Sequence, residues 1–148
     1  MYLDIKDPEQ HIWYNGRKEI FKSPTFRQGV AVRELTEQDS SIIQQYIDLF
    51  NSEITWTGMF DLDTALFRLK KGHRMFGLFD DKILGYCWVD DDYLYNFFVS
   101  QKRVKGDSHD FCNYICKLID KDVKLFVVKP NIKGQKFFEK VGFTRIDS

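Results

Sequence analysis

Three apolar segments joined by short acidic turns constrain the fold of this chain more than any other feature. They are residues 75–79, 83–89 and 93–99, and the turns are residues 80–82 and 90–92. Connections this short join antiparallel neighbours, because a parallel crossover needs a dozen or more residues. The sequence therefore predicts a three-stranded antiparallel meander. Strict alternation along the third strand places Tyr93, Tyr95, Phe97 and Val99 on one face and Leu94, Asn96 and Phe98 on the other.

Helical periodicity appears on both sides of this meander. A strand at 30–35 is followed by Thr36, a good N-cap for an amphipathic helix that fades near residue 51, and a second helix spans 61–71 before Gly72. Beyond the meander we expect a helix ending near 119, a strand at 123–128, a helix at 133–141 and a strand at 142–146. This order predicts a mixed α/β (α+β) fold with one central, mostly antiparallel sheet flanked by helices.

The first 29 residues precede this core and contain their own signal. Residues 12–14 and 17–21 are strand-like arms joined by Asn15-Gly16, the dipeptide that best suits a two-residue hairpin turn. We therefore expect an N-terminal β-hairpin extension at 1–29 and a core at 30–146. The hairpin is apolar, so it either packs on its own domain or mediates self-association, and both a monomer and a homodimer are open.

Length and composition bound the function. A chain of 148 residues is expected to form one domain over 1–148, and 22 basic against 22 acidic residues argue against a nucleic-acid or membrane-surface partner. No apolar run suits a membrane span or a signal peptide, so a cytoplasmic location is expected. The odd cysteine count favours reduced core thiols over a metal site, and no metal is predicted. The cysteines are Cys87, Cys112 and Cys116.

The stretch that carries chemistry is the loop at 101–108, which leads from the aromatic third strand of the meander into a helix. Lys102, Arg103 and Lys105 make the loop basic, and Gly106 adds a small residue. Unpaired amides and the helix dipole at such a position can bind a phosphate or pyrophosphate. A basic turn before a helix is more often only a solvated turn, so the loop alone leaves both interpretations open.

Two motifs in this region resemble a known family. Residues 103–108, read as Arg-Val-Lys-Gly-Asp-Ser, are similar to R/Q-x-x-G-x-G/A, and Asn131 precedes a helix that ends in Phe-Phe-Glu-Lys-Val-Gly-Phe at 137–143. Their order and spacing resemble the GCN5-related N-acetyltransferase (GNAT) superfamily over residues 30–146. The resemblance implies a GNAT-like acyl-CoA N-acyltransferase fold and direct transfer of an acetyl group from acetyl-CoA to an amine of a small molecule or peptide, which the sequence does not identify.

The resemblance also implies positions for the cofactor. Backbone groups of Phe97, Phe98 and Val99 should pair with the pantetheine arm, and the Phe98 amide should polarise the thioester carbonyl. The pyrophosphate should lie on the amides of Val104, Lys105, Gly106, Asp107 and Ser108, with the side chains of Arg103 and Lys105 nearby. Asn131 should border the pantetheine, and Phe137 and Phe138 should flank the thiol.

Three residues depart from the family pattern. Ser108 stands for Gly or Ala, although it suits an N-cap, and Asp107 puts a negative charge beside the pyrophosphate position unless it turns to solvent. Phe138 stands where many members have the Tyr that protonates the leaving thiolate. A phenyl ring cannot donate a proton, so the alternative is a catalytically silent GNAT-fold binding or scaffold protein.

Other residues are candidates for proton transfer. Tyr95 and Tyr114 are candidate acids and Glu53 is a candidate base, although a core tyrosine and a solvated glutamate are the ordinary interpretations of such residues. The three histidines lie in no recognised nucleophile pattern. Trp56 and Met59, in the loop at 52–60, either contact the acceptor or fill the edge of the core.

Overall fold

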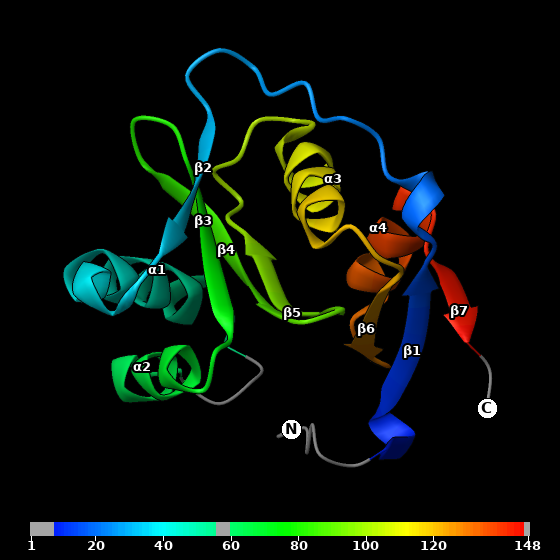
Figure 1. Ribbon diagram of the computed structural model, residues 1–148, viewed down its shortest axis with the longest axis horizontal. Coiled ribbons are helices and arrows are strands. Elements are labelled where there is room, and N and C mark those ends of the chain that lie inside the picture. Colours follow the sequence, from blue (N-terminus) through cyan, green and yellow to red (C-terminus); the bar gives the residue numbers. More distant parts are fainter. Residues whose placement is uncertain (1–7, 56–59, 147–148) are drawn as a thin grey trace.

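The computed structural model describes residues 8–55 and 60–146 and confirms the mixed α/β fold (Figure 1). Seven strands form one sheet in the order β2-β3-β4-β5-β6-β1-β7. The strands are β1 (His11–Gly16), β2 (Ala31–Leu35), β3 (Arg74–Phe79), β4 (Ile83–Asp90), β5 (Tyr93–Val99), β6 (Val123–Val128) and β7 (Thr144–Ile146). The helices are α1 (Ser40–Glu53), α2 (Leu62–Lys70), α3 (Asp107–Ile119) and α4 (Ile132–Val141). All strand pairs are antiparallel except β5 with β6, so the predicted meander β3-β4-β5 is confirmed.

Local capping explains where the first two helices begin and end. Thr36 and Asp39 form a capping box around a short 3-10 turn that leads into α1. The Asp61 carboxylate accepts a hydrogen bond from the Thr64 amide at the start of α2. Gly72 follows α2 with a φ of 91°, the left-handed conformation that glycine adopts without strain. These boundaries agree with the prediction from sequence to within a few residues.

The sheet is covered on both faces, which gives two cores. Helices α1 and α2 pack on one face, where Tyr86, Trp88 and Phe98 are buried. Helices α3 and α4 cover the other face. There the three cysteines are free and fully buried, as predicted. Among the described helices, none has the length and apolarity needed to cross a membrane.

The predicted N-terminal hairpin is wrong. Only its first arm is a strand, and β1 lies inside the sheet, antiparallel to β6 on one side and to β7 on the other. The chain then forms a 3-10 turn at Lys18–Ile20 instead of a second arm. The physical reason is burial, because a hairpin has only its own two arms to pair, whereas the sheet gives β1 two neighbours and leaves Tyr14 only 1% exposed. Gly16 is needed for packing, since a Cβ there would lie 2.6 Å from the Phe143 ring.

The predicted alternation along β5 is also wrong beyond Asn96. The register between β4 and β5 shifts between the pairs Tyr86 with Phe98 and Trp88 with Tyr95, which leaves one extra residue on β5. Asn96 has a φ of 51°, so the strand carries a bulge there. As a result Phe97 packs on the α3 and α4 face, while Tyr95 and Phe98 share the other face.

Candidate functional site

The sheet opens between β5 and β6. These strands are parallel, and their only registered pair among the described residues is Tyr93 with Lys124, next to a 2.8 Å hydrogen bond from the Lys124 amide to the Asp92 carbonyl. Beyond that point the last three residues of β5, Phe97–Val99, have no strand partner on the β6 side in the part of the chain that the structure describes. An unpaired strand edge can hydrogen-bond to an extended ligand as it would to another strand.

The register of β5 decides which backbone groups face this opening. The Ser100 amide donates to the Leu84 carbonyl of β4 at 2.6 Å. Two residues earlier on β5, Phe98 pairs with Tyr86 of β4 in the same register. Since backbone groups alternate in direction along a strand, the Phe98 amide points to β4 and the Val99 backbone points to the opening. The Phe98 carbonyl oxygen agrees with this direction, because it lies 2.3 Å from the position that a Cβ on Gly85 would take. This register therefore directs the Phe98 amide toward β4 rather than toward the opening, where a thioester is expected.

Aromatic rings line the α3 and α4 side of the opening. The Phe97 ring centroid lies 5.2 Å from that of Phe111, 5.7 Å from Phe137 and 5.8 Å from Phe138. Phe138 is buried. This wall is apolar and supplies no proton donor.

In the loop between β5 and α3, some of the amides predicted to bind a pyrophosphate are free and others are already hydrogen-bonded. The Val104 amide donates to the Asp107 carboxylate at 3.0 Å, and the Asp107 amide donates to the Val104 carbonyl at 3.1 Å. The amides of Lys105, Gly106 and Ser108 have no acceptor within the described parts of the chain. Gly106, with a φ of 97°, is the N-cap of α3, so the expectation that Ser108 caps this helix is wrong. The Asp107 carboxylate accepts from the Val104 amide within this turn, and α3 begins two residues earlier than a helix capped by Ser108 would.

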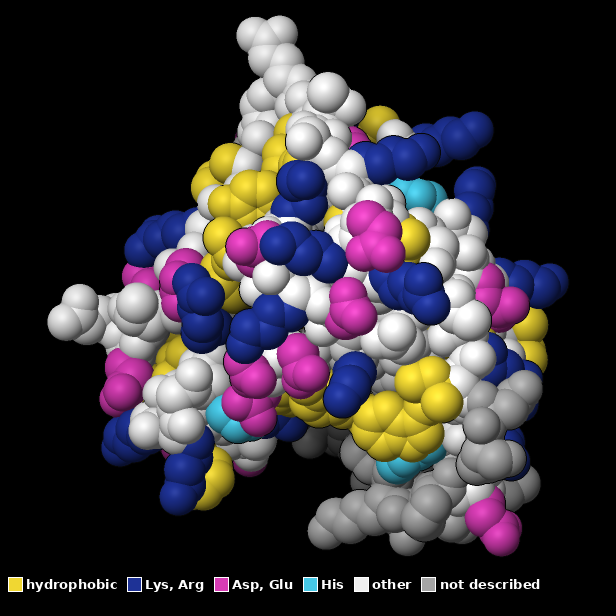
Figure 2. All heavy atoms as spheres, turned by 45° about the vertical axis from the view of Figure 1, so that its right-hand side comes forward, with side chains coloured by type: hydrophobic (Ala, Val, Ile, Leu, Met, Phe, Trp, Pro, Cys, Tyr) yellow, Lys and Arg dark blue, Asp and Glu magenta, His cyan; other side chains and the backbone are white. Residues whose placement is uncertain are grey.

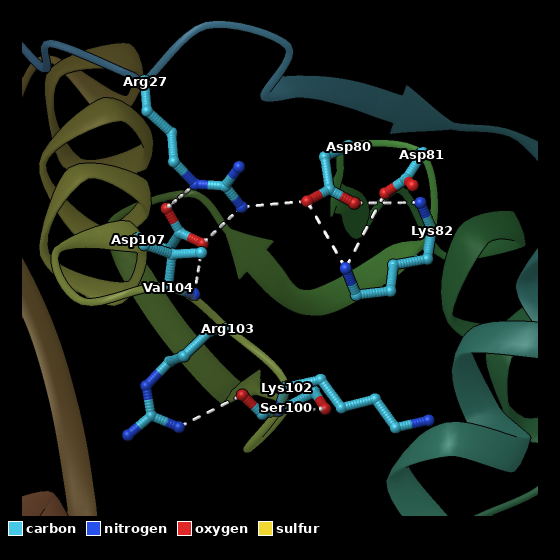
Figure 3. A network of polar contacts seen from close by, with 9 residues as sticks. All are labelled: Arg27, Asp80, Asp81, Lys82, Ser100, Lys102, Arg103, Val104 and Asp107. Atoms are coloured by element: carbon cyan, nitrogen blue, oxygen red, sulfur yellow. Dashed lines mark hydrogen bonds and ion pairs between the residues drawn. The ribbon is translucent and has the colours of Figure 1, made fainter.

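The Asp107 side chain turns toward Arg27 and the Val104 amide (Figure 3). It is 2% exposed, and its carboxylate accepts two hydrogen bonds of 3.0 Å from the Arg27 guanidinium. Arg27 also donates to Asp80 in the turn between β3 and β4, at 2.9 Å. These bonds raise the pKa of Arg27, and the bond from Arg27 holds the pKa of Asp80 well below its usual range. Arg27 therefore neutralises the negative charge that Asp107 brings to the loop.

The cations of the loop remain available. Lys102, Arg103 and Lys105 are exposed, and none of them forms an ion pair with the described residues, although Arg103 donates to the Ser100 carbonyl at 3.1 Å. Glu53, at the end of α1, holds the other end of the loop: its carboxylate accepts from the Ser100 hydroxyl at 2.5 Å and from the Gln101 amide at 2.9 Å. Both Glu53 oxygens are thus occupied in positioning the loop.

Tyr95 belongs to a hydrogen-bonded chain on the α1 and α2 face. Its hydroxyl lies 2.5 Å from Nδ1 of His73, and Nε2 of His73 lies 3.4 Å from the Asp90 carboxylate. Burial raises the pKa of Tyr95 to about 12, so the phenol is neutral at physiological pH. Tyr114, in contrast, packs against Phe26 of the N-terminal segment, with ring centroids 5.7 Å apart.

Two further predicted positions have simpler settings. The Asn131 side chain caps α4 by accepting from the Gly134 amide at 3.0 Å. Trp56 and Met59 lie outside the described residues. In the described ranges 8–55 and 60–146, no three histidine, cysteine or carboxylate side chains are grouped to hold a metal ion.

Sequence reasoning missed three residues of this region: Arg27, His73 and Arg68. Arg68 had a visible signal, because it lies three residues after Ala65 on the core-facing side of α2, where a charged side chain is unusual. The partners of Arg27 lie 53 and 80 residues away in sequence, and those of His73 lie 17 and 22 residues away. No local pattern indicates such contacts.

A sheet that is splayed between two parallel strands, with helices on both faces and a free strand edge leading to a helix N-terminus, defines the class of this fold. It is the fold of the GCN5-related N-acetyltransferases, as comparison with solved structures shows. The GCN5-related N-acetyltransferase from Sphaerobacter thermophilus matches with a TM-score of 0.69 and 10% identity, over 92% of this chain and 48% of that one.

Other structures share the fold. An aminoglycoside acetyltransferase from an uncultured soil metagenomic sample matches with a TM-score of 0.67 and 16% identity, over 84% of this chain and 94% of that one. A Drosophila protein matches with a TM-score of 0.70 and 14% identity, over 92% of this chain and 47% of that one. This chain thus spans about half of the Drosophila and Sphaerobacter proteins. Comparison of the sequence with family models and with curated proteins gave no match.

Proposed function

We propose that this chain is an acetyl-CoA-dependent N-acetyltransferase that moves an acetyl group directly to an amine of a small molecule or peptide. The observation that carries the proposal is the continuity of two features. The free edge at the end of β5 leads within a few residues to the unpaired amides of Lys105, Gly106 and Ser108. Structural neighbours named as acetyltransferases support the same reaction class.

The residues present fit such a cofactor. A pantetheine arm carries amide groups, which the Val99 backbone can pair as a strand would, and the Phe97 wall can pack against its methylene groups. A pyrophosphate suits the N-terminus of α3, because three amides and three cations without partners among residues 8–55 and 60–146 lie there together with the helix dipole. When bound, acetyl-CoA supplies an acetyl thioester that an amine attacks with release of the thiol.

The chain itself offers a route for the proton that the amine loses. With the proton of His73 on Nε2, toward Asp90, the Nδ1 atom accepts the Tyr95 hydroxyl proton, and the phenol oxygen can accept the proton of an amine. The Asp90 carboxylate then faces the imidazolium and stabilises it. This assignment replaces Glu53, whose oxygens are occupied by the loop.

A silent binding or scaffold protein is the second candidate. One observation favours it: Phe138 is buried among phenylalanine rings, so the position that would hold a tyrosine acid has no hydroxyl and no polar neighbour among them. This candidate differs from the enzyme in one measurable way. It predicts that acetyl-CoA, if bound, is never consumed in the presence of any amine.

Calorimetric titration with acetyl-CoA tests the proposal. We expect saturable binding, and replacement of two loop cations, Arg103→Gln with Lys105→Gln, should weaken it by roughly 2- to 30-fold, since each exposed ion pair with a phosphate contributes about 0.2–1 kcal/mol. Lys117→Gln, an exposed charge near the other end of α3, is the matched control and should leave the Kd unchanged. Absence of saturable binding at millimolar acetyl-CoA would overturn the proposal.

A further inference from the structure

A cationic side chain lies among aromatic rings on the α1 and α2 face of the sheet, beside Tyr95. The Arg68 guanidinium carbon lies 4.6 Å from the ring centroid of Phe60, 5.1 Å from that of Tyr95 and 5.3 Å from that of Trp88. We call Arg68, Phe60, Trp88 and Tyr95 the Arg68 cage. Aromatic rings at these distances attract the cation but do not accept its N–H groups as a carboxylate does.

Two hydrogen-bond donors in the Arg68 cage have no acceptor. Nη1 of Arg68 and Nε1 of Trp88 are both buried and unpartnered within the described ranges. Trp88 is 0% exposed, and buried donors of this kind are rare because leaving them unpaired costs free energy. Neither donor is bonded to an acceptor among the described residues, the Tyr95 hydroxyl included.

No carboxylate of the described chain compensates the Arg68 charge. Asp90, the carboxylate that acts on Tyr95, is paired with His73, and the Tyr95 hydroxyl is also bonded to His73. Burial lowers the pKa of Arg68, as expected for a cation that has lost water without gaining an anion. An acceptor-only group of negative charge would satisfy both donors and the charge at once.

The cage continues into an apolar strip across the sheet. The Tyr95 ring stacks with Tyr93 at 5.1 Å, Tyr93 stacks with Phe126 at 6.2 Å, and Phe126 packs against Trp13 at 5.3 Å. Trp13 is 42% exposed, so the strip reaches the surface. Figure 2 shows hydrophobic side chains and a histidine gathered near the lower edge of the molecule, among the charged side chains that cover much of this view.

We propose that the Arg68 cage binds the carboxylate of the acceptor, so that the substrate class is an amine that also carries a carboxylate and an apolar body, such as an aromatic amino acid. The inference rests on the proposed function. The cage shares Tyr95 with the proposed proton route, so a carboxylate on Arg68 holds the acceptor on the face from which its amine reaches the opening beside β5. A polycationic acceptor would instead meet the unpaired positive charge of Arg68.

The first test is binding to the protein without acetyl-CoA. L-phenylalanine and L-phenylalaninamide differ only in the carboxylate, so they form a matched pair of probes. In a ¹H–¹⁵N spectrum we expect L-phenylalanine to shift the indole N–H signal of Trp88 downfield in a saturable way, whereas L-phenylalaninamide leaves it in place. The signal is assigned by its loss in Trp88→Phe. Equal shifts with both probes, or none with either, would overturn the inference.

The second test uses variants. Arg68→Met keeps the length of the side chain and removes the charge, and Arg74→Met, which breaks a surface pair with Glu34, is the control. We expect Arg68→Met to abolish the preference for L-phenylalanine, raising its KM at least 10-fold with little change in kcat, and Arg74→Met to preserve it. Arg68→Met should also keep or raise the Tm, because the lost group is an unpaired buried charge. A lowered Tm with an unchanged preference would show a purely structural Arg68.

The two proposals fail in distinguishable ways. If acetyl-CoA binds but the carboxylate and amide probes behave alike, the Arg68 cage is not the acceptor site and the acetyltransferase proposal stands. If acetyl-CoA does not bind while L-phenylalanine still shifts Trp88, the proposed function is wrong and the cage remains a carboxylate site of a binding protein. Each result is read from a separate titration.

Discussion

The bulge at Asn96 gives a prediction whose magnitude follows from the structure. Asn96 adopts a φ of 51°, and its side-chain carbonyl accepts a 3.2 Å hydrogen bond from the hydroxyl of Tyr86, a residue that is fully buried. Asn96→Ala removes both supports. The left-handed conformation costs alanine about 1 kcal/mol more than asparagine, and the unsatisfied hydroxyl costs about 1–3 kcal/mol. The expected loss of stability is about 2–4 kcal/mol, or roughly 4–16 °C in Tm for a chain of this size.

A second substitution and a second background separate these two costs. Asn96→Gly removes the acceptor but tolerates the positive φ, so it should destabilise by about 1–3 kcal/mol. In a Tyr86→Phe background there is no hydroxyl to satisfy. There Asn96→Gly should be close to neutral, while Asn96→Ala should still cost about 1 kcal/mol. Urea unfolding at equilibrium measures all of these differences.

The stability order in the Tyr86→Phe background decides the matter. If Asn96→Ala and Asn96→Gly are equally stable there, backbone strain does not hold the bulge and the reasoning is refuted. A functional consequence accompanies the stability loss, because the bulge sets which backbone groups of Phe97–Val99 face the β5–β6 opening. We expect Asn96→Ala to weaken acetyl-CoA binding more than Asn96→Gly at a temperature where both are folded.

Three further predictions concern the loop and the core. Arg27 keeps the pKa of Asp80 below its ordinary value of 3.8, so near that pH the unfolded chain binds more protons than the native protein and stability is lost as pH falls. In Arg27→Gln, the free energy of unfolding measured in urea should therefore change less between about pH 5 and about pH 2. A Cβ at Gly106 would meet no atom within 4 Å, so only the φ of 97° opposes Gly106→Ala. The left-handed conformation costs alanine roughly 1–2 kcal/mol, and the Tm should fall by about 2–4 °C for each kcal/mol. The same variant should bind acetyl-CoA more weakly. The three buried cysteines should resist a thiol reagent in the native protein and release three equivalents after unfolding in guanidinium, whereas rapid native labelling would contradict their burial.

Much of the fold could be predicted because its signals are local. The turn at 80–82 and the box formed by Thr36 with Asp39 specify neighbours only a few residues apart. The Asn15-Gly16 dipeptide predicted a hairpin turn that does not form, because Gly16 is required by its packing against the rings of Phe21 and Phe143. Phe143 lies more than 120 residues away in sequence. Periodicity likewise cannot show a bulge, because Asn96 reads as an ordinary strand residue until its partner strand is known.

In the candidate site, too, the local features could be predicted from the sequence and the contacts between distant segments could not. The loop at 103–108 was visible as a sequence motif, and its cations and Gly106 lie where an anion could bind. The sequence could not show which amides remain free, because Val104 depends on the direction of the Asp107 side chain. It also could not show the Arg68 cage, whose rings come from the loop before α2 and from two strands. A site built from segments distant in sequence can be identified only once the fold is known.

The N-terminal segment links these observations, because it belongs to the sheet at one end and to the anion loop at the other. After β1 it runs along α3 (Figure 1), where the Lys22 amide donates to Asn113 at 3.0 Å, Phe26 packs on Tyr114 and Arg27 neutralises Asp107. Truncation near Gly29 would not isolate the role of this segment in self-association. It would instead remove the strand between β6 and β7 and leave Asp107 a buried, unpaired carboxylate. Any change in oligomeric state after such a truncation would report damage to the sheet and to the loop, so point substitutions on the exposed face of β1, such as Trp13→Ser, are the sound way to ask about self-association.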